Sequence, residues 1–247
     1  MLNRFRMLAC TAVVTALWAG ASIVPQAQVA SGGPGGGLTA DQQKYRPGRP
    51  DLSRTGVEVL PVQGNVYLIV TGVGSNIVAQ VGDQGAILVD ASVAEVSGKV
   101  IAEVRRLTSG PIRGIVDTSM DADHIGGNAS IAAVGQPMFQ GNTGFLDGPQ
   151  ATIFAHEKGF NRISLSGSPQ LLPEKQWPTD TFFTAKKKLF FNHEPIEIRW
   201  TPALTDGDVM VWFRGSDVIA AGDTFTPMSY PKFDPSRGGS IQGCSTA

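Results

Sequence analysis

Short apolar runs separated by glycine-rich turns open the central part of the chain. Four such runs, rich in Val and Ile, occupy residues 57–62, 65–71, 75–81 and 85–90. Apolar and β-branched residues between Gly-Asn, Gly-Val-Gly and Gly-Asp-Gln-Gly turns are typical of consecutive β-strands. The pattern therefore predicts four strands in succession.

The apolar spacing then changes to a helical period. Ser92 is expected to cap a helix that ends at Leu107, with one apolar face formed by Val93, Val96, Val100, Val104 and Leu107. A strand is expected from Ile112, and a shorter helix over Asn128–Val134. Residues 142–180 are interpreted as helical and irregular. Three more strands are expected at 195–201, 208–213 and 218–222, with a hairpin turn at 214–217. Strand runs on both sides of helical segments predict layered α and β structure with two sheets.

The N-terminal residues have a different pattern. Arg4 and Arg6 precede an uncharged apolar run from Met7 to Val24, and small residues follow. This order is typical of a secretory signal peptide, so we expect cleavage after about residue 30 and a periplasmic or secreted protein. The alternative is an uncleaved N-terminal membrane anchor. Residues 31–56 are expected to form a flexible linker, and residues 57–247 the folded domain.

Composition narrows the class of protein. The net charge is −1, with Lys+Arg 20 and Asp+Glu 21, so no global charge attracts nucleic acid or an anionic membrane. Charged residues at 17% and hydrophobic residues at 42% suit a packed chain and exclude a disordered polyelectrolyte. Cys10 and Cys244 are too few for a disulfide scaffold or a cysteine-built zinc site. We expect no nucleic-acid partner, and no stable membrane association after cleavage; the oligomeric state stays open.

Candidate chemistry lies in the loop after the strand that begins at Ile112. Asp121, Asp123 and His124 place two carboxylates and an imidazole within four residues, at the end of a strand where α/β layers usually carry sites. These residue types are ligands for divalent metals. The alternative is a loop whose aspartates cap the following helix, and the spacing alone does not decide between the two.

The ordered motifs resemble those of the metallo-β-lactamase superfamily from about Val57 to Gly243. The loop DTSMDADHIGGN is similar to the family's H-x-H-x-D-H-x-G-G-N segment, TPALTDGDVMVWF to its P-x-H-T-x-G-D segment, and AAGDTF to its G-D-x-F segment. The resemblance implies a four-layer αββα sandwich, here incomplete at the C-terminus. It also implies metal-assisted hydrolysis of a small-molecule substrate.

The same resemblance implies an impaired metal site. The family's first metal is held by three histidines, whose positions here carry Ser119, Asp121 and Leu204. The second metal's ligands would be Asp123, His124 and the bridging Asp223, without the family's last histidine. We therefore expect at most one divalent ion, weakly held; zinc is favoured, with manganese or iron as alternatives.

The function implied is hydrolysis of an ester, thioester, lactam or related bond by an exported protein. Asp121 would be a fourth ligand or the base that orients water, and Asp123 is the other candidate catalytic carboxylate. The competing hypothesis is a catalytically inactive, degenerate or truncated member that acts as a non-enzymatic protein. His156 and His193 are expected to have surface or hydrogen-bonding roles, and Lys186–Lys188 to form a solvated turn.

Overall fold

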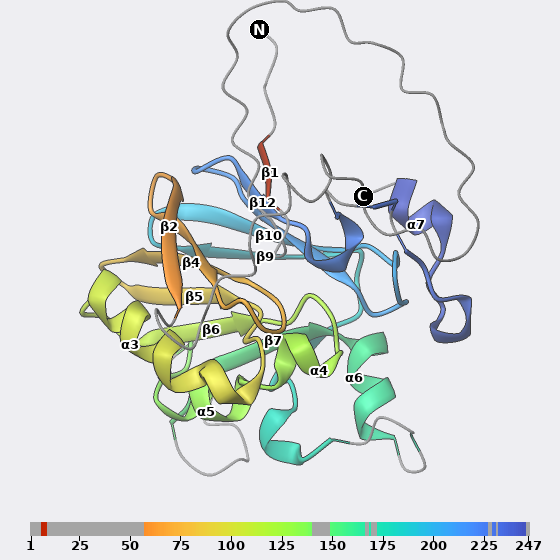
Figure 1. Cartoon of the computed structure of the whole chain (residues 1–247), viewed down its shortest axis with the longest axis horizontal. Coiled ribbons are helices and arrows are strands. Elements are labelled where there is room, and N and C mark those ends of the chain that lie inside the picture. The colour runs from red at the N-terminus through yellow and green to blue at the C-terminus, as the bar shows by residue number, and fades with distance from the viewer. Residues whose placement is uncertain are drawn as a thin grey trace, which may run out of the picture.

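Two mixed β-sheets face each other and form the centre of the molecule (Figure 1). The computed structural model describes residues 6–8 (backbone only), 57–139, 149–165, 168, 172–226, 229–230 and 232–245. The two-sheet α and β architecture expected from the sequence is confirmed. The expected signal peptide and linker lie outside the described residues, apart from residues 6–8. C-terminal incompleteness stays a prediction.

The larger sheet has seven strands in chain order. They are β2 (Glu58–Gln63), β3 (Val66–Val70), β4 (Ile77–Gly82), β5 (Gly85–Val89), β6 (Ile112–Val116), β7 (Thr152–His156) and β8 (Asp180–Phe182). Strands β2 to β5 form an antiparallel meander, and β5 to β8 run parallel. The parallel half therefore directs several strand ends to one edge, where its loops meet.

The smaller sheet has five strands in the order β1 (Arg6–Leu8), β12 (Val218–Ala220), β11 (Val209–Phe213), β10 (Glu194–Trp200) and β9 (Lys186–Phe191). Strand β1 pairs in parallel with β12. It belongs to the expected signal peptide, so cleavage near residue 30 would leave four strands in this sheet.

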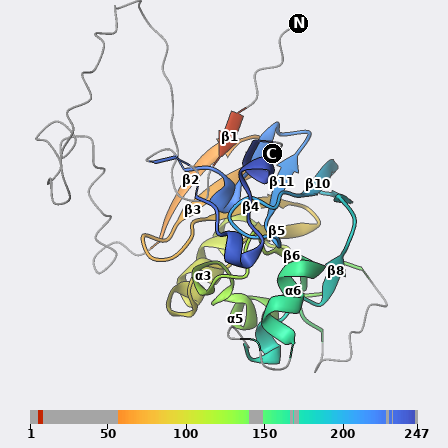
Figure 2. The same ribbon diagram turned by 90° about the vertical axis from the view of Figure 1, so that its right-hand side faces the viewer.

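Helices cover the outer face of the seven-stranded sheet. Figure 1 and the rotated view in Figure 2 show α3 (Ser97–Leu107), α5 (Asn128–Ala133) and α6 (Glu157–Ser164) together on that side. The remaining short elements are α4 (Ala122–Ile125), α7 (Ile241–Ser245), η1 (Ala94–Val96), η2 (Glu174–Gln176), η3 (Gly222–Thr224) and η4 (Pro235–Arg237). None of the helices in the described part of the chain is long and apolar enough to cross a membrane.

Alternation along the strands divides the core into two layers. Leu68, Val78 and Ile87 point between the sheets, where they pack against residues of the smaller sheet such as Phe213. Ile69, Ile77, Ala79 and Leu88 point the other way, toward the helices, and pack with Val96, Val100 and Val104. Because side chains alternate along a strand, both faces of β3 to β5 are buried, which explains their continuous apolar runs.

Three expectations about single elements were wrong. Ser92 has a positive φ of 56° and does not cap the helix. Its hydroxyl instead donates to the carbonyl of Val73 at 2.9 Å. Residues 142–180 contain β7 and β8 besides α6. Lys186–Lys188 begins strand β9, with Lys186 and Lys188 exposed on one face.

Candidate functional site

The predicted loop lies between β6 and α5 and is held by backbone hydrogen bonds. The amide of Ser75 donates to the carbonyl of Asp123 at 2.8 Å, and the amide of Ala91 donates to the carbonyl of His124 at 2.7 Å. The loop is thereby fixed against the segments that follow β3 and β5. Helix α4 begins after Asp121, whose side chain makes no cap hydrogen bond. The capping alternative therefore does not explain Asp121.

His124 is the best-ordered candidate side chain. It is 2% exposed, and its Nδ1 lies 3.0 Å from Oδ2 of Asp90 and 3.2 Å from Oγ1 of Thr118. Its Nε2 lies 3.3 Å from Oδ2 of Asp223 and 4.0 Å from Oδ2 of Asp123. The carboxylate of Asp90 thus orients the ring so that Nε2 faces two further carboxylates, as in metal-ligating histidines held by an outer carboxylate.

Electrostatics favour a positive charge at this imidazole. Burial alone would lower the pKa of His124, but the carboxylates of Asp90 and Asp223 outweigh it and raise that pKa well above its usual value. Burial would raise the pKa of Asp223, yet the contact with His124 and the charge of Arg237 lower it. The carboxylates around His124 therefore favour a positive charge at this position, which either a protonated imidazole or a bound cation can supply.

Asp90 belongs to the candidate site through its contact with His124, and the motif analysis missed it. It follows β5, is fully buried, and has a positive φ of 67°. Besides its contact with His124, it accepts hydrogen bonds from the amide of Thr118 at 2.8 Å and from the Thr118 hydroxyl at 2.7 Å. The available signal was a carboxylate that ends an otherwise apolar, buried strand.

Asp223 reaches the loop because of the glycine before it. Gly222 has a φ of +54°, and a Cβ at that position would lie 2.6 Å from Oγ1 of Thr118. Only glycine allows this close approach of η3 to the loop after β6. The sequence motifs around residues 124 and 223, 99 positions apart, are thereby brought into contact.

The three positions of the family's first metal do not fit a metal ion. Ser119 is buried, and its Oγ accepts a hydrogen bond from the amide of Asp121 at 3.3 Å. Asp121 accepts a hydrogen bond from Nη1 of Arg237 at 2.5 Å, which places a cation beside the one carboxylate of the set. The apolar side chain of Leu204 cannot ligate. We derive no chemistry through a metal at these positions.

The ligand positions of the family's second metal carry suitable donor groups, but their side chains do not converge on one point. Asp123, His124 and Asp223 offer two carboxylates and an oriented imidazole, which are ordinary ligands of divalent ions. Within the described residues, however, no three side chains of His, Cys, Asp or Glu converge closely enough to hold an ion. The side chain of Asp123 is 56% exposed and would have to move inward.

A cleft of about 240 Å³ opens beside these residues. Its lining includes Leu204, Asp223, Phe225, Thr226, Ser229 and Lys232. Leu204 and Phe225 supply apolar surface, and the polar and charged groups of the other four residues can orient a small molecule. The cleft thus places Asp223 and the apolar residue 204 on one surface.

The other two histidines lie elsewhere. His156 is buried at the start of α6, where its Nδ1 accepts a hydrogen bond from the amide of Lys158 at 3.3 Å, and its ring stacks on Trp200. His193 lies in the exposed turn between β9 and β10, with Nε2 3.1 Å from Asp83. Neither contacts the cluster around His124, in agreement with the hydrogen-bonding roles expected for them.

Several metallo-β-lactamases are among the solved structures that resemble this chain. One from Cronobacter sakazakii with a HARLDQ motif is 18% identical and has a TM-score of 0.56, covering 77% of this chain and 72% of that chain. The enzyme SMB-1, bound to 2-mercaptoethanesulfonate, is 20% identical with a TM-score of 0.51, covering 73% and 70%. A subclass B3 enzyme from a soil metagenome library is 21% identical with a TM-score of 0.49, covering 64% and 58%.

The chain therefore spans between 58% and 72% of the length of these three proteins. No curated protein matches the sequence significantly. The family model described as the metallo-beta-lactamase superfamily matches residues 59–244. This range contains strands β3 to β12 and every candidate site residue. By this match the chain belongs to the metallo-β-lactamase superfamily.

Proposed function

We propose that this chain is an exported hydrolase whose cleft takes one divalent ion at Asp123, His124 and Asp223. The reaction class is hydrolysis of an ester, thioester, lactam or related bond in a small molecule. The observation that carries the proposal is the orientation of His124, with Nδ1 on Asp90 and Nε2 facing Asp223. A buried imidazole held in this way is arranged to bind a cation at Nε2.

Each protein group has a distinct part in the proposed reaction. When bound, a divalent ion supplies Lewis acidity and lowers the pKa of bound water. Asp90 fixes the tautomer of His124 by accepting from Nδ1–H. Asp123, whose side chain is 56% exposed, is the carboxylate suited to accept a proton from water. Asp121 is ion-paired with Arg237, so it is less suited to that task.

The donor set also bears on the identity of the ion. Two carboxylates and one imidazole form a harder set than the histidine-rich sites of the resembled family. We propose zinc held weakly, with manganese and iron as competitors. The exposed position of Asp123 supports weak binding, because ordering a mobile side chain opposes ligation.

The test compares His124→Ala with the matched control His193→Ala, since both remove one histidine and only the first removes a proposed ligand. The purified variants are loaded with zinc, dialysed and assayed for bound metal and for hydrolysis of β-lactam, thioester, lactone and aryl ester substrates. We expect the His193→Ala variant to match the parent and the His124→Ala variant to lose both metal and turnover. Equal metal content in the two variants would refute the assignment of His124.

A second candidate is a catalytically inactive member that acts as a non-enzymatic protein. Leu204 and the ion pair between Asp121 and Arg237 favour it, because both occupy positions that the resembled family uses for a metal. A parent chain that binds no ion at micromolar zinc and hydrolyses none of these substrates would favour this candidate.

We also propose export, on the basis of the basic start and the apolar run from Met7 to Val24. Mass spectrometry of the protein from its native envelope tests this directly. The expected mature chain lacks about the first thirty residues. An intact Met1 with the apolar run retained would instead indicate a membrane anchor.

A further inference from the structure

A segment near the C-terminus is fastened along the loop that carries Leu204. The amide of Asp234 donates to the carbonyl of Leu204 at 2.8 Å, and the amide of Asp206 donates to the carbonyl of Arg237 at 3.0 Å. Thr205 and Gly238 form an isolated β-bridge between these two hydrogen bonds. The backbone of η4 therefore has a fixed position relative to residue 204.

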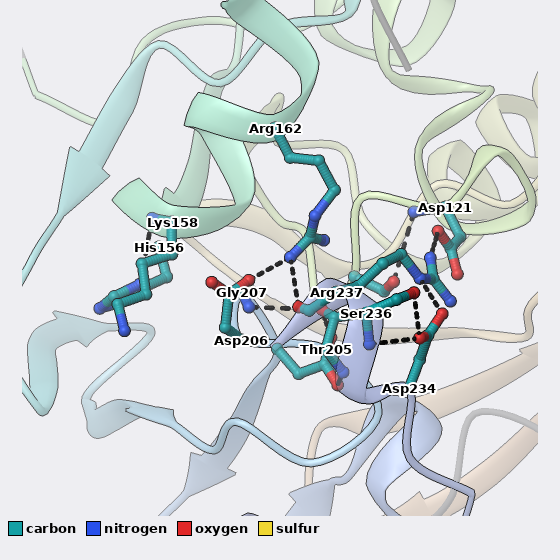
Figure 3. A network of polar contacts seen from close by, with 12 residues as sticks. Asp121, His156, Lys158, Arg162, Thr205, Asp206, Gly207, Asp234, Ser236 and Arg237 are labelled. Carbon is teal, nitrogen blue, oxygen red and sulfur yellow. Dashed lines mark hydrogen bonds and ion pairs between the residues drawn. The ribbon is translucent and has the colours of Figure 1, made fainter. Parts of the chain in front are cut away.

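This segment directs the guanidinium of Arg237 to Asp121. Nη1 donates to Oδ1 of Asp121 at 2.5 Å, and Nε donates to Oδ2 of Asp234 at 2.8 Å (Figure 3). Asp234 is itself held, because its Oδ1 accepts from the amide and the hydroxyl of Ser236. Arg162 fixes the backbone of the same residue by donating from Nη2 to the carbonyl of Arg237 at 3.2 Å.

The arginine is positively charged and only a quarter exposed. Its side chain is 26% exposed, and that of Asp121 is 22% exposed. Burial alone would lower the pKa of Arg237, but Asp234 and Asp121 raise it above its usual value. Its charge also acts on Asp223, whose pKa it helps to lower. The fixed charge of Arg237 thus pairs with the carboxylate of Asp121 and helps to lower the pKa of Asp223.

We propose that Arg237 is a resident cation that takes the place of a first metal ion and closes that half of the cleft to metals. Its guanidinium neutralises Asp121, and the backbone that carries it lies directly on the Leu204 loop. A divalent ion at positions 119, 121 and 204 would meet a like charge, and such juxtaposition weakens binding by about 100-fold or more. This role of Arg237 does not depend on whether the chain hydrolyses any substrate.

The proposal changes what is needed to rebuild the first site. Histidines at Ser119 and Leu204, with Asp121 retained, would provide a three-ligand set of the kind that zinc accepts. Equilibrium dialysis against zinc, followed by elemental analysis, counts the ions bound. We expect Ser119→His/Leu204→His to bind no more zinc than the parent. Adding Arg237→Gln should give one further ion per chain, with an affinity at least about 100-fold higher at that site.

The control is Arg106→Gln in the same double variant. Arg106 is an exposed arginine on α3 that pairs with Glu103, outside the network around Arg237, so its removal should leave the zinc count unchanged. The proposal is overturned if the double variant gains an ion while Arg237 is intact. It is equally overturned if the triple variant, folded as judged by its thermal unfolding, gains none.

A second measurement does not depend on an Arg237 variant that folds. In the Ser119→His/Leu204→His chain, the Nε–H resonance of Arg237 reports on its hydrogen bond with Asp234. We expect this resonance to remain unchanged through a zinc titration. Loss or displacement of the resonance with added zinc would show that metal expels the guanidinium, against the proposal.

Discussion

At the scale of single residues, two polar side chains determine the character of the site, and neither belongs to the loop motif. Asp90 orients His124 from the end of β5, and Arg237 pairs with Asp121 across 116 residues of sequence. The spacing of Asp121, Asp123 and His124 left a cation site and a capping loop as alternatives, and the family resemblance favoured the cation site. The spacing could not indicate Asp90 or Arg237, since their roles depend on long-range contacts that the fold creates.

The first prediction concerns Asp90. Replacing it by Asn keeps the size of the side chain but removes the charge that holds Nδ1–H of His124. Loss of such an outer partner lowers metal affinity by about 10- to 100-fold. Competition between the protein and a chelator for zinc measures this change in the Asp90→Asn variant. An affinity equal to that of the parent would mean that Asp90 has no part in positioning the ligand.

At the scale of elements, the prediction succeeded where apolar periodicity was regular. Strands β2 to β6 follow from runs of Val and Ile bounded by turn residues, and the buried face of α3 follows from apolar residues at helical spacing. Strand β9 was missed because three consecutive lysines hide its alternation. Lys187 lies between the exposed Lys186 and Lys188 and places its Nζ over the ring of Phe154, 5.3 Å from the ring centroid. Strand β7 was missed because it leads directly into α6 at Glu157, with no glycine or proline turn to mark its end.

The second prediction concerns the connection between β10 and β11. Asp208 is buried, and its carboxylate accepts hydrogen bonds from the amide of Thr205 at 2.7 Å and from the Thr205 hydroxyl. Burial raises the pKa of Asp208 to about 6, against the opposing effect of these hydrogen bonds. The native state therefore holds this proton more tightly than the unfolded state does, for which the usual pKa is about 3.9.

It follows that Asp208 makes the free energy of unfolding fall as pH rises from about 4 to about 6, by about 3 kcal/mol in total. Above that range the contribution is constant. Urea unfolding of the parent and of Asp208→Asn at several pH values isolates this contribution as a difference. The prediction is wrong if both proteins show the same pH dependence between pH 4 and pH 6.

At the scale of the whole molecule, the site and the main polar link between the sheets lie at opposite ends of β5. Near Gly85, the Nε2 of Gln80 donates to Oε1 of Glu194 at 2.9 Å, and the amide of Ser216 donates to Oε2 at 2.8 Å. Gln80 lies on the seven-stranded sheet and Glu194 on the other. Glu194 is 6% exposed, so its hydrogen bonds join the sheets within the interior.

The third prediction follows from this separation. Glu194→Ala leaves the buried amide of Ser216 without its acceptor and removes one of the two acceptors of Gln80 Nε2, and the expected loss in the free energy of unfolding is about 2–4 kcal/mol. Zinc affinity at His124 should be unchanged, because the substitution lies at the far end of the sheets. Denaturant unfolding and zinc titration of one preparation test both parts. A variant as stable as the parent, or one with altered zinc affinity, would contradict the prediction.

The central claim concerns the whole cleft: one half is arranged to bind a cation, and the other is already occupied by Arg237. Titration of zinc into the metal-free parent chain, with the stoichiometry read from the heat of binding and confirmed by elemental analysis, tests this claim most directly. The account predicts at most one ion per chain, released readily to a chelator. Two tightly held zinc ions per chain would contradict it.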